Sequence, residues 1–412
     1  MRRWAQRRGS DPGRARALAV VIGVSSAASC ASLCFAPLAP FFVDDLGLGF
    51  VAVATLNVAL FVGAAAASLH AGRWVDRLGY GPALTLGVAL MTCWFVAAAL
   101  GPGYWWLLAC AAGAGLAFSF VNPAANLAVG AGFDPRRRGT VMGLKQSGIS
   151  LGGVAAGIWL PAVAVAWGWR VALLQVAALL AVAAVWSALT LGAPRRVAAG
   201  REPRRPAGPT PRAYALWIGG VLLSCPQALL MLFIALYVSK EGRVGPTLAG
   251  ALFAATQIAA LVGRPVLGVV SDVVTGGRRR SVLVGAALGG AVAMLGLAVV
   301  PAENVPAVAA LSVLGGLTSI GWNGVYMAAL VDVAPPESAG AVSGVGVGLN
   351  LAAVVVFPLV AGVLLDAGAG FETIWLGGAL FGFGAAVSFA SFSERSSVSQ
   401  VPAPDPKSAS GF

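Results

Sequence analysis

The chain alternates between long apolar runs and short polar interruptions from residue 17 almost to its end. Most runs hold roughly 20 or more residues, the length that an α-helix needs to cross the hydrocarbon core of a membrane. Breaking the runs at their charged, proline-rich or glycine-rich interruptions predicts twelve transmembrane helices. They cover residues 17–43, 50–72, 80–101, 104–132, 139–166, 169–192, 213–239, 245–272, 281–301, 304–333, 338–365 and 371–393.

Basic residues favour one side of these predicted helices. Of the 27 Lys and Arg residues, 22 lie in polar segments that the twelve spans place on one side, three lie on the other side, and two lie within spans. Cytoplasmic loops of membrane proteins carry an excess of positive charge. We therefore expect both termini in the cytoplasm and the chain in an inner or plasma membrane. A missed or additional helix would invert every basic loop beyond it, so this partition also supports the number of spans.

Composition excludes a water-soluble protein. Hydrophobic residues make up 58% of the chain and charged residues 10%, against roughly 45–50% and 25% in soluble domains. The net charge of +12 would favour nucleic-acid binding in a soluble chain. Here the basic residues are concentrated on one side of the predicted membrane helices, which explains the net charge by membrane topology. We therefore expect no nucleic-acid partner.

One long polar interruption, residues 194–212, falls near the midpoint and contains five Pro and six Arg. We interpret it as a cytoplasmic linker that lies against anionic lipid headgroups. It separates a predicted N-terminal six-helix bundle, residues 1–193, from a predicted C-terminal one, residues 213–394. Residues 395–412, rich in Ser and Pro, are expected to form a disordered tail.

The two halves repeat each other in sequence. Residues 72–76 (Gly-Arg-Trp-Val-Asp) recur as residues 268–272 (Gly-Val-Val-Ser-Asp) at an offset of 196, and Asn122 recurs as Asn323 at an offset of 201. Two homologous bundles around a central cavity are the architecture of alternating-access transporters. The predicted fold is an all-α membrane protein with twelve transmembrane helices in two pseudo-symmetric six-helix bundles.

The loop after the second span carries Gly72-x-x-x-Asp76-Arg77-x-Gly79, and part of it recurs after the eighth span. This pattern resembles the signature loop of the major facilitator superfamily, and span number, half-repeat and linker extend the resemblance over the whole chain. In that family the glycine permits tight helix packing, and the aspartate meets cationic side chains and a helix N-terminus at the cytoplasmic gate. Alternatively, Asp76 and Arg77 only mark the membrane boundary. The gating residues that the resemblance implies are Gly72, Asp76, Arg77, Gly268 and Asp272.

Lys145 and Arg264 are the two basic residues inside the predicted spans. A charge at mid-membrane costs about 2.5–3.5 kcal/mol on insertion scales, so each is expected to face a cavity or a partner. Lys145 lies about 9 Å and Arg264 about 12 Å from the predicted cytoplasmic helix ends, at 1.5 Å per residue. In the resembled family helices 5 and 8 meet between the halves, so both cations could converge on one anion. Alternatively, Lys145 extends back towards the cytoplasm and Arg264 is a gate residue that pairs with backbone carbonyls.

Uncharged polar residues within the spans complete the predicted substrate-binding site. Gln257 lies seven residues before Arg264 and shares its helix face, and Asn122 and Asn126 share a face one turn apart. Each such residue either faces the substrate or only bonds two helices together. The remaining candidates are Asn57, Asn323, Tyr326 and Asn350.

Gly263-Arg264-Pro265 with Gly268 also resembles helix 8 of monocarboxylate and related organic-anion carriers. We predict a secondary active transporter that moves a small organic anion by alternating access; the alternative is efflux of a hydrophobic drug or natural product. No Asp or Glu lies in the middle of a predicted span, and neither a catalytic cluster nor a phosphate-binding loop is visible. We therefore expect no enzyme, no cofactor and no bound metal. Expected partners are a small-molecule substrate, a co-transported ion if transport is coupled, and the lipid bilayer, with the chain a monomer.

Overall fold

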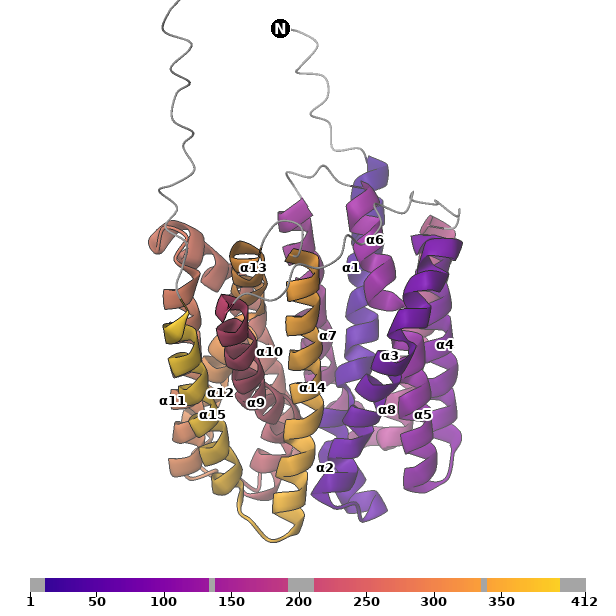
Figure 1. Cartoon of the computed structure of the whole chain (residues 1–412). Coiled ribbons are helices and arrows are strands. Elements are labelled where there is room, and N and C mark those ends of the chain that lie inside the picture. The colour runs from indigo at the N-terminus through magenta and orange to yellow at the C-terminus, as the bar shows by residue number, and fades with distance from the viewer. Residues whose placement is uncertain (1–11, 133–137, 192–210, 335–338, 393–412) are drawn as a thin grey trace, which may run out of the picture.

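The computed structural model describes residues 12–132, 138–191, 211–334 and 339–392 (Figure 1). Every secondary-structure element in these residues is helical, and twelve segments are long and apolar enough to cross a membrane. They confirm the twelve predicted spans. The predicted linker reaches the first turn of the seventh span at Pro211; the rest of it, like the predicted tail, lies outside the described residues.

Each span is a single helix or a series of two or three consecutive helical segments. In lipid every backbone polar group must be bonded within the protein, which is why each span is helical. The first six spans are α1 (Pro12–Leu33) with α2 (Phe35–Leu46), α3 (Phe50–Leu78), α4 (Tyr80–Leu100), α5 (Gly103–Phe118) with α6 (Val121–Gly132), α7 (Arg138–Trp167) and α8 (Trp169–Leu191). The last six are α9 (Pro211–Lys240), α10 (Pro246–Val269) with the π-helical turn η2 (Val270–Val274), α11 (Arg279–Val299), α12 (Val305–Gly315) with the π-helical turn η3 (Gly316–Ile320) and α13 (Asn323–Val333), α14 (Ala339–Asp366) and α15 (Phe371–Ser391).

Two of the turns between spans consist of a single glycine. Gly79 separates α3 from α4 at φ 82°, and Gly168 separates α7 from α8 at φ 83°. Positive φ is accessible to glycine because it has no Cβ atom. These turns reverse the chain at once, so each helix packs beside the next.

Three spans are interrupted along their length. The first breaks at Cys34, and the fourth and tenth break just before Asn122 and Asn323. The fourth and tenth spans are counterparts under the sequence repeat, so the break and its asparagine occur once in each half. Irregular backbone at membrane depth is tolerated where protein buries it or where it lines a cavity, and transporters commonly build binding sites at such breaks.

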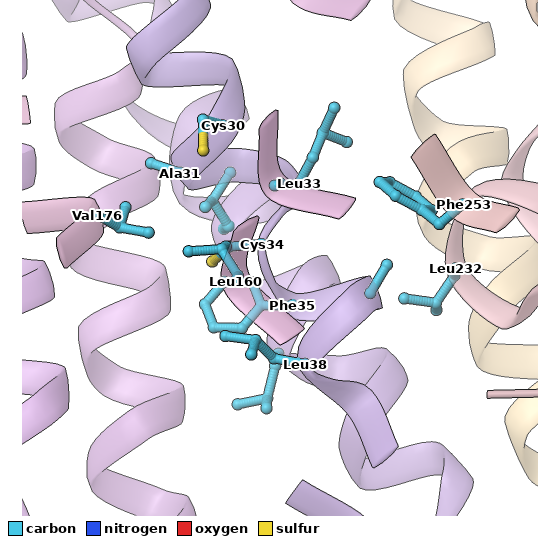
Figure 2. Close-up of a cluster of buried hydrophobic side chains, with 14 of the residues drawn as sticks. Cys30, Ala31, Leu33, Cys34, Phe35, Leu38, Leu160, Val176, Leu232 and Phe253 are labelled. Carbon is cyan, nitrogen blue, oxygen red and sulfur yellow. The ribbon is translucent and has the colours of Figure 1, made fainter. Parts of the chain in front are cut away.

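The break in the first span lies in the hydrophobic core between the halves. Cys34 and Phe35 are 0% and 1% exposed. The same buried cluster contains Leu160 of α7 as well as Leu232 of α9 and Phe253 of α10 (Figure 2). Apolar side chains from both halves therefore close over this break, and the irregular backbone there is kept away from lipid.

The halves share a core at one end of the molecule and separate at the other. One buried cluster combines the N-terminal half with the C-terminal parts of α9, α11 and α14 and the N-terminal parts of α10, α12 and α15. A second cluster belongs to the C-terminal half alone and contains the opposite ends of α9, α11 and α15 together with α13. We call the shared end, where the exterior loops are predicted, the outer end, and the other the inner end. The described halves are thus closed at the outer end and apart at the inner end.

Polar and aromatic contacts also join the halves at the outer end, where α3 and α14 converge (Figure 1). The carboxylate of Asp366 at the end of α14 accepts hydrogen bonds from the backbone amides of Phe50 and Val51 at the start of α3, at 2.7 and 3.0 Å. Lys240 forms an ion pair with Asp44 at 2.6 Å. These contacts depend on the two outer ends being together.

Helices α7 and α10 cross between the halves at closely apposed glycines. A Cβ atom at Gly157 would lie 2.7 Å from the carbonyl oxygen of Gly250, and one at Gly250 would lie 2.3 Å from the carbonyl oxygen of Gly157. Only glycine allows the backbones to approach so closely. This crossing holds α7 against α10, the two helices that carry Lys145 and Arg264.

Candidate functional site

Lys145, near the inner end of α7, is buried against the broken fourth span. Its side chain is 3% exposed. The Nζ atom donates to Oδ1 of Asn122 at 3.0 Å and to Oδ1 of Asn126 at 2.9 Å. Both asparagines lie on α6, four residues apart, as their shared helix face predicted. The structure thus places the Lys145 side chain inside the protein, bonded to α6, and away from solvent.

Arg264 approaches the same level of α7 from the other half. Its guanidinium donates to the backbone carbonyl of Gln146, the residue after Lys145, at 2.7 Å. The side chain is half-buried. Helices 5 and 8 therefore meet as the family resemblance implied, with a cation from each half at neighbouring positions. The carbonyl contact also agrees with the alternative that Arg264 bonds backbone at a gate.

Neither cation has a carboxylate partner among the described residues. The ion pairs of the described chain are Lys240 with Asp44, and Arg279 with Asp272 and with Asp332. Neutral oxygens compensate only part of the free energy lost when a charge is removed from water. The arrangement at Lys145 and Arg264 is therefore suited chemically to accept an anion.

Gln257 lies on the α10 face that points at α7, as its spacing from Arg264 predicted. It is 1% exposed and packs on Gly153, where an added Cβ atom would lie 2.8 Å from the side chain. Its Nε2 atom has no hydrogen-bond partner among the described residues. Gln257 therefore fills the crossing between the halves and retains one unused donor.

The C-terminal half holds a second polar cluster around Gln227 of α9. Its Oε1 accepts hydrogen bonds from the indole nitrogen of Trp322 at 3.0 Å and from Nδ2 of Asn323 at 3.3 Å. Trp322 is 0% exposed, so it does not face lipid. Gln227 was not among the residues predicted from the sequence. The sequence feature that could have indicated it is a long polar amide in an apolar span, directly after Pro226. Such an amide requires a buried hydrogen-bond partner.

The other predicted polar residues are divided between the halves. The Tyr326 hydroxyl and Asn350 Oδ1 both approach Gly220, where an added Cβ atom would lie 2.6 and 2.8 Å from them. Tyr326 is buried beside Trp322. Asn57 is half-buried on α3 and makes no hydrogen bond within the described chain. The structure therefore joins Asn122, Asn126 and Lys145 in one group and Asn323, Tyr326 and Asn350 in a separate region.

The predicted gating residues lie at the inner end. Asp272 pairs with Arg279, which also reaches Asp332 at 3.3 Å and Ser271 Oγ at 2.8 Å. Asp332 was not selected from the sequence. This charge cluster ties the eighth, ninth and tenth spans together within the C-terminal half.

The first-half gate is described only in part. Arg77 is exposed, and the side chain of Asp76 lies outside the described residues. A Cβ atom at Gly72 or Gly268 would meet nothing within 4 Å. The tight packing that the resemblance implied at these glycines is therefore not made with the described residues, in agreement with the separation of the halves at the inner end.

Two six-helix halves that share a core at one end and carry polar residues between them are the architecture of polytopic membrane transporters. The sequence profile of the Major Facilitator Superfamily matches residues 20–215 and again residues 216–411. The chain belongs to that superfamily.

Two transporters are similar in sequence to part of this chain. An uncharacterized MFS-type transporter of Mycobacterium tuberculosis is 28% identical over 282 residues, which are 66% of this chain and 62% of that protein. The hexuronate transporter of Bacillus subtilis is 31% identical over 154 residues, which are 37% of this chain and 35% of that transporter. The chain thus covers less than two thirds of the length of either relative.

Solved structures with the same fold are more distant in sequence. A bacterial homolog of the human lysosomal transporter Spinster, in an inward-facing and occupied conformation, matches with a TM-score of 0.77 and 17% identity over 92% of this chain and 97% of that one. A POT family transporter in complex with 5-aminolevulinic acid matches with a TM-score of 0.74 and 14% identity over 91% of this chain and 94% of that one. At these identities the likeness shows the fold alone.

Proposed function

We propose that this protein is a secondary active transporter that moves a small organic anion across the membrane by alternating access. The observation that carries the proposal is the environment of Lys145, which is buried with amide oxygens as partners beside the half-buried Arg264. Two positive charges here would be energetically unfavourable in the empty site, because neither has a carboxylate partner among the described residues. An anionic substrate would offset both charges.

A carboxylate is the anion that best suits this pair. A guanidinium presents parallel donors that match the two oxygens of a carboxylate, whereas an ammonium acts as a compact charge. The similarity to a transporter of hexuronates, which are sugar carboxylates, supports the same substrate class. The substrate-binding group would contain Lys145, Arg264, Asn122 and Asn126, with Gln257 at the crossing. The polar residues Asn57, Asn323, Tyr326 and Asn350 would contact the rest of the substrate.

The orientation is part of the proposal. The basic loops predicted at the inner end support an orientation with both termini in the cytoplasm and the protein in an inner or plasma membrane. The state described here would then be open to the cytoplasm and closed to the exterior. Gly72, Asp76, Arg77, Gly268 and Asp272 would act when the inner ends approach each other, with residues 194–212 linking bundles 1–193 and 213–394 of a monomer.

The test compares two ligands that differ mainly in one charged group. D-glucuronate carries a carboxylate where D-glucose carries a neutral CH2OH group, and both are titrated into purified protein. Lys145→Ala and Arg264→Ala should each weaken glucuronate binding by about 2–5 kcal/mol, the range for truncating one partner of a buried charge pair. Arg264→Lys should also weaken it, because lysine lacks the planar fork.

Arg170→Ala is the matched control. Arg170 also donates to backbone carbonyls, those of Ala99 and Gly101, but it lies at the outer end of α8. Its removal should leave glucuronate affinity unchanged. If neither Lys145→Ala nor Arg264→Ala loses carboxylate affinity, the organic-anion proposal fails. Neutral or cationic drugs that bind better after these substitutions would favour the alternative, export of hydrophobic compounds.

A further inference from the structure

Acidic and histidine side chains are poorly placed to carry a proton through the middle of this membrane protein. All 15 Asp and Glu residues lie in the predicted loops or near the ends of predicted spans, and the single histidine, His70, lies near the inner end of α3. Arg264 keeps its charge, because a guanidinium does not lose its proton in proteins. Lys145 is the one lysine inside a span rather than at its end, and an amine can exist in both protonation states.

No described charge of opposite sign faces Lys145. On α6 its partners are Asn122 and Asn126. The adjoining stretch of α1, residues 17–29, has no charged residue, and the charge that α10 presents is the guanidinium of Arg264. The remaining charged groups of the neighbouring helices lie towards the helix ends: Arg14 and Arg16 near the inner end of α1, Arg170 at the outer end of α8, and Asp44 and Asp45 at the outer end of α2.

The hydrogen bonds of Lys145 suit both protonation states. A neutral amine has two N–H donors, which are enough for the oxygens of Asn122 and Asn126. Protonation adds a third N–H and a positive charge without breaking either bond. The third N–H is then available to a carboxylate, while the asparagines hold the nitrogen in place.

We propose that Lys145 is the proton-coupling group of transport, an inference that rests on the proposed function. The empty carrier holds Lys145 as the neutral amine beside the permanent charge of Arg264, because a second unpaired charge there is unfavourable. When a carboxylate enters, the amine takes a proton from water on the open side, and the ammonium pairs with the anion. After the halves rearrange, carboxylate and proton leave to the other side. One proton crosses with each monoanion, and the amine is regenerated.

The first experiment measures proton uptake when ligand binds. D-glucuronate is added to purified full-length protein in weakly buffered solution containing a pH indicator, at neutral and alkaline pH. Carboxylates remain ionised there, since they titrate near pH 4, so uptake reports the protein. Wild type should take up about one proton per glucuronate bound at alkaline pH. Lys145→Arg is expected to bind glucuronate more weakly, because Lys145 contacts it, and to take up no proton even when the glucuronate concentration is raised until the site is filled.

The matched control is Lys240→Arg, the same substitution at an exposed lysine that pairs with Asp44 at the outer end. It should take up protons as wild type does. The proposal is overturned if wild type binds glucuronate without taking up a proton, or if Lys145→Arg takes up as many protons as wild type. If wild type binds glucose and no carboxylate, the proposed substrate class itself is wrong, which is a distinct result.

A second experiment uses reconstituted vesicles and does not depend on equilibrium binding. An inward proton gradient should drive net accumulation of labelled glucuronate by wild type. Lys145→Arg should still exchange external labelled for internal unlabelled glucuronate, because exchange requires no deprotonation of the empty carrier, but should lose accumulation driven by the gradient. Exchange also shows that the variant is folded. Undiminished accumulation by Lys145→Arg would overturn the assignment of the proton to Lys145.

Discussion

Asp366→Asn should weaken the closure of the outer end. The two carboxylate oxygens of Asp366 accept the amides of Phe50 and Val51 from the other half, at 2.7 and 3.0 Å, and place a negative charge at the positive end of α3. Replacing a helix-capping side chain by alanine costs about 0.5–2 kcal/mol, and a charge at a helix end contributes about 0.3–1 kcal/mol. Asp366 is exposed and asparagine keeps one acceptor oxygen, so we expect a loss of about 1 kcal/mol.

This loss of free energy destabilises only the conformation in which the outer end is closed. The bonds from Asp366 join the two halves and cannot form when the outer ends separate. A loss of about 1 kcal/mol therefore lowers the ratio of outer-closed to outer-open molecules about fivefold. Electron spin resonance can measure that ratio as a distribution of distances between labels on cysteines replacing Trp105 and Val299, which are exposed at the outer end of each half, in a background free of other cysteines.

A control substitution at a neighbouring aspartate distinguishes the loss of the Asp366 hydrogen bonds from a general effect of removing negative charge. Asp45 is exposed at the same end, near the end of α2, and makes no hydrogen bond within the described chain. Asp45→Asn should leave the distance distribution as in wild type, whereas Asp366→Asn should broaden it towards longer distances. Equal distributions for wild type and Asp366→Asn would refute the reasoning, because the interhalf cap would then contribute nothing to closure.

Two further predictions concern topology and packing. Single cysteines replacing Ala199 and Ser408 in a cysteine-free background should resist an impermeant thiol reagent in intact cells, and labelling of either from outside would contradict cytoplasmic termini. Gly157→Ala should destabilise the protein by about 1–3 kcal/mol, seen as a lower melting temperature, because its Cβ atom would lie 2.7 Å from the Gly250 carbonyl oxygen. Gly285→Ala, where an added Cβ atom meets nothing within 4 Å, is the control and should melt at or above the wild-type temperature.

The candidate site was predictable in part because intramembrane charge is rare. Lys145 and Arg264 stood out in the sequence since a charge within a span needs a compensating environment, and the spacing of Asn122 and Asn126 gave their common face. The choice of partner was not predictable. A helical period tells which residues share a face, but the rotation of that face towards Lys145 of α7 depends on how the helices pack.

The sequence by itself determined the number of spans and their arrangement as two related halves, because lipid leaves a long apolar segment no structure other than a helix with its own hydrogen bonds. The tertiary structure alone decided where spans break, as at Cys34, and that Gln227 holds both Trp322 and Asn323. It also decided which end closes, through contacts such as that of Asp366 with α3. These features join residues far apart in the chain, and local hydrophobic patterning carries no information about such pairings.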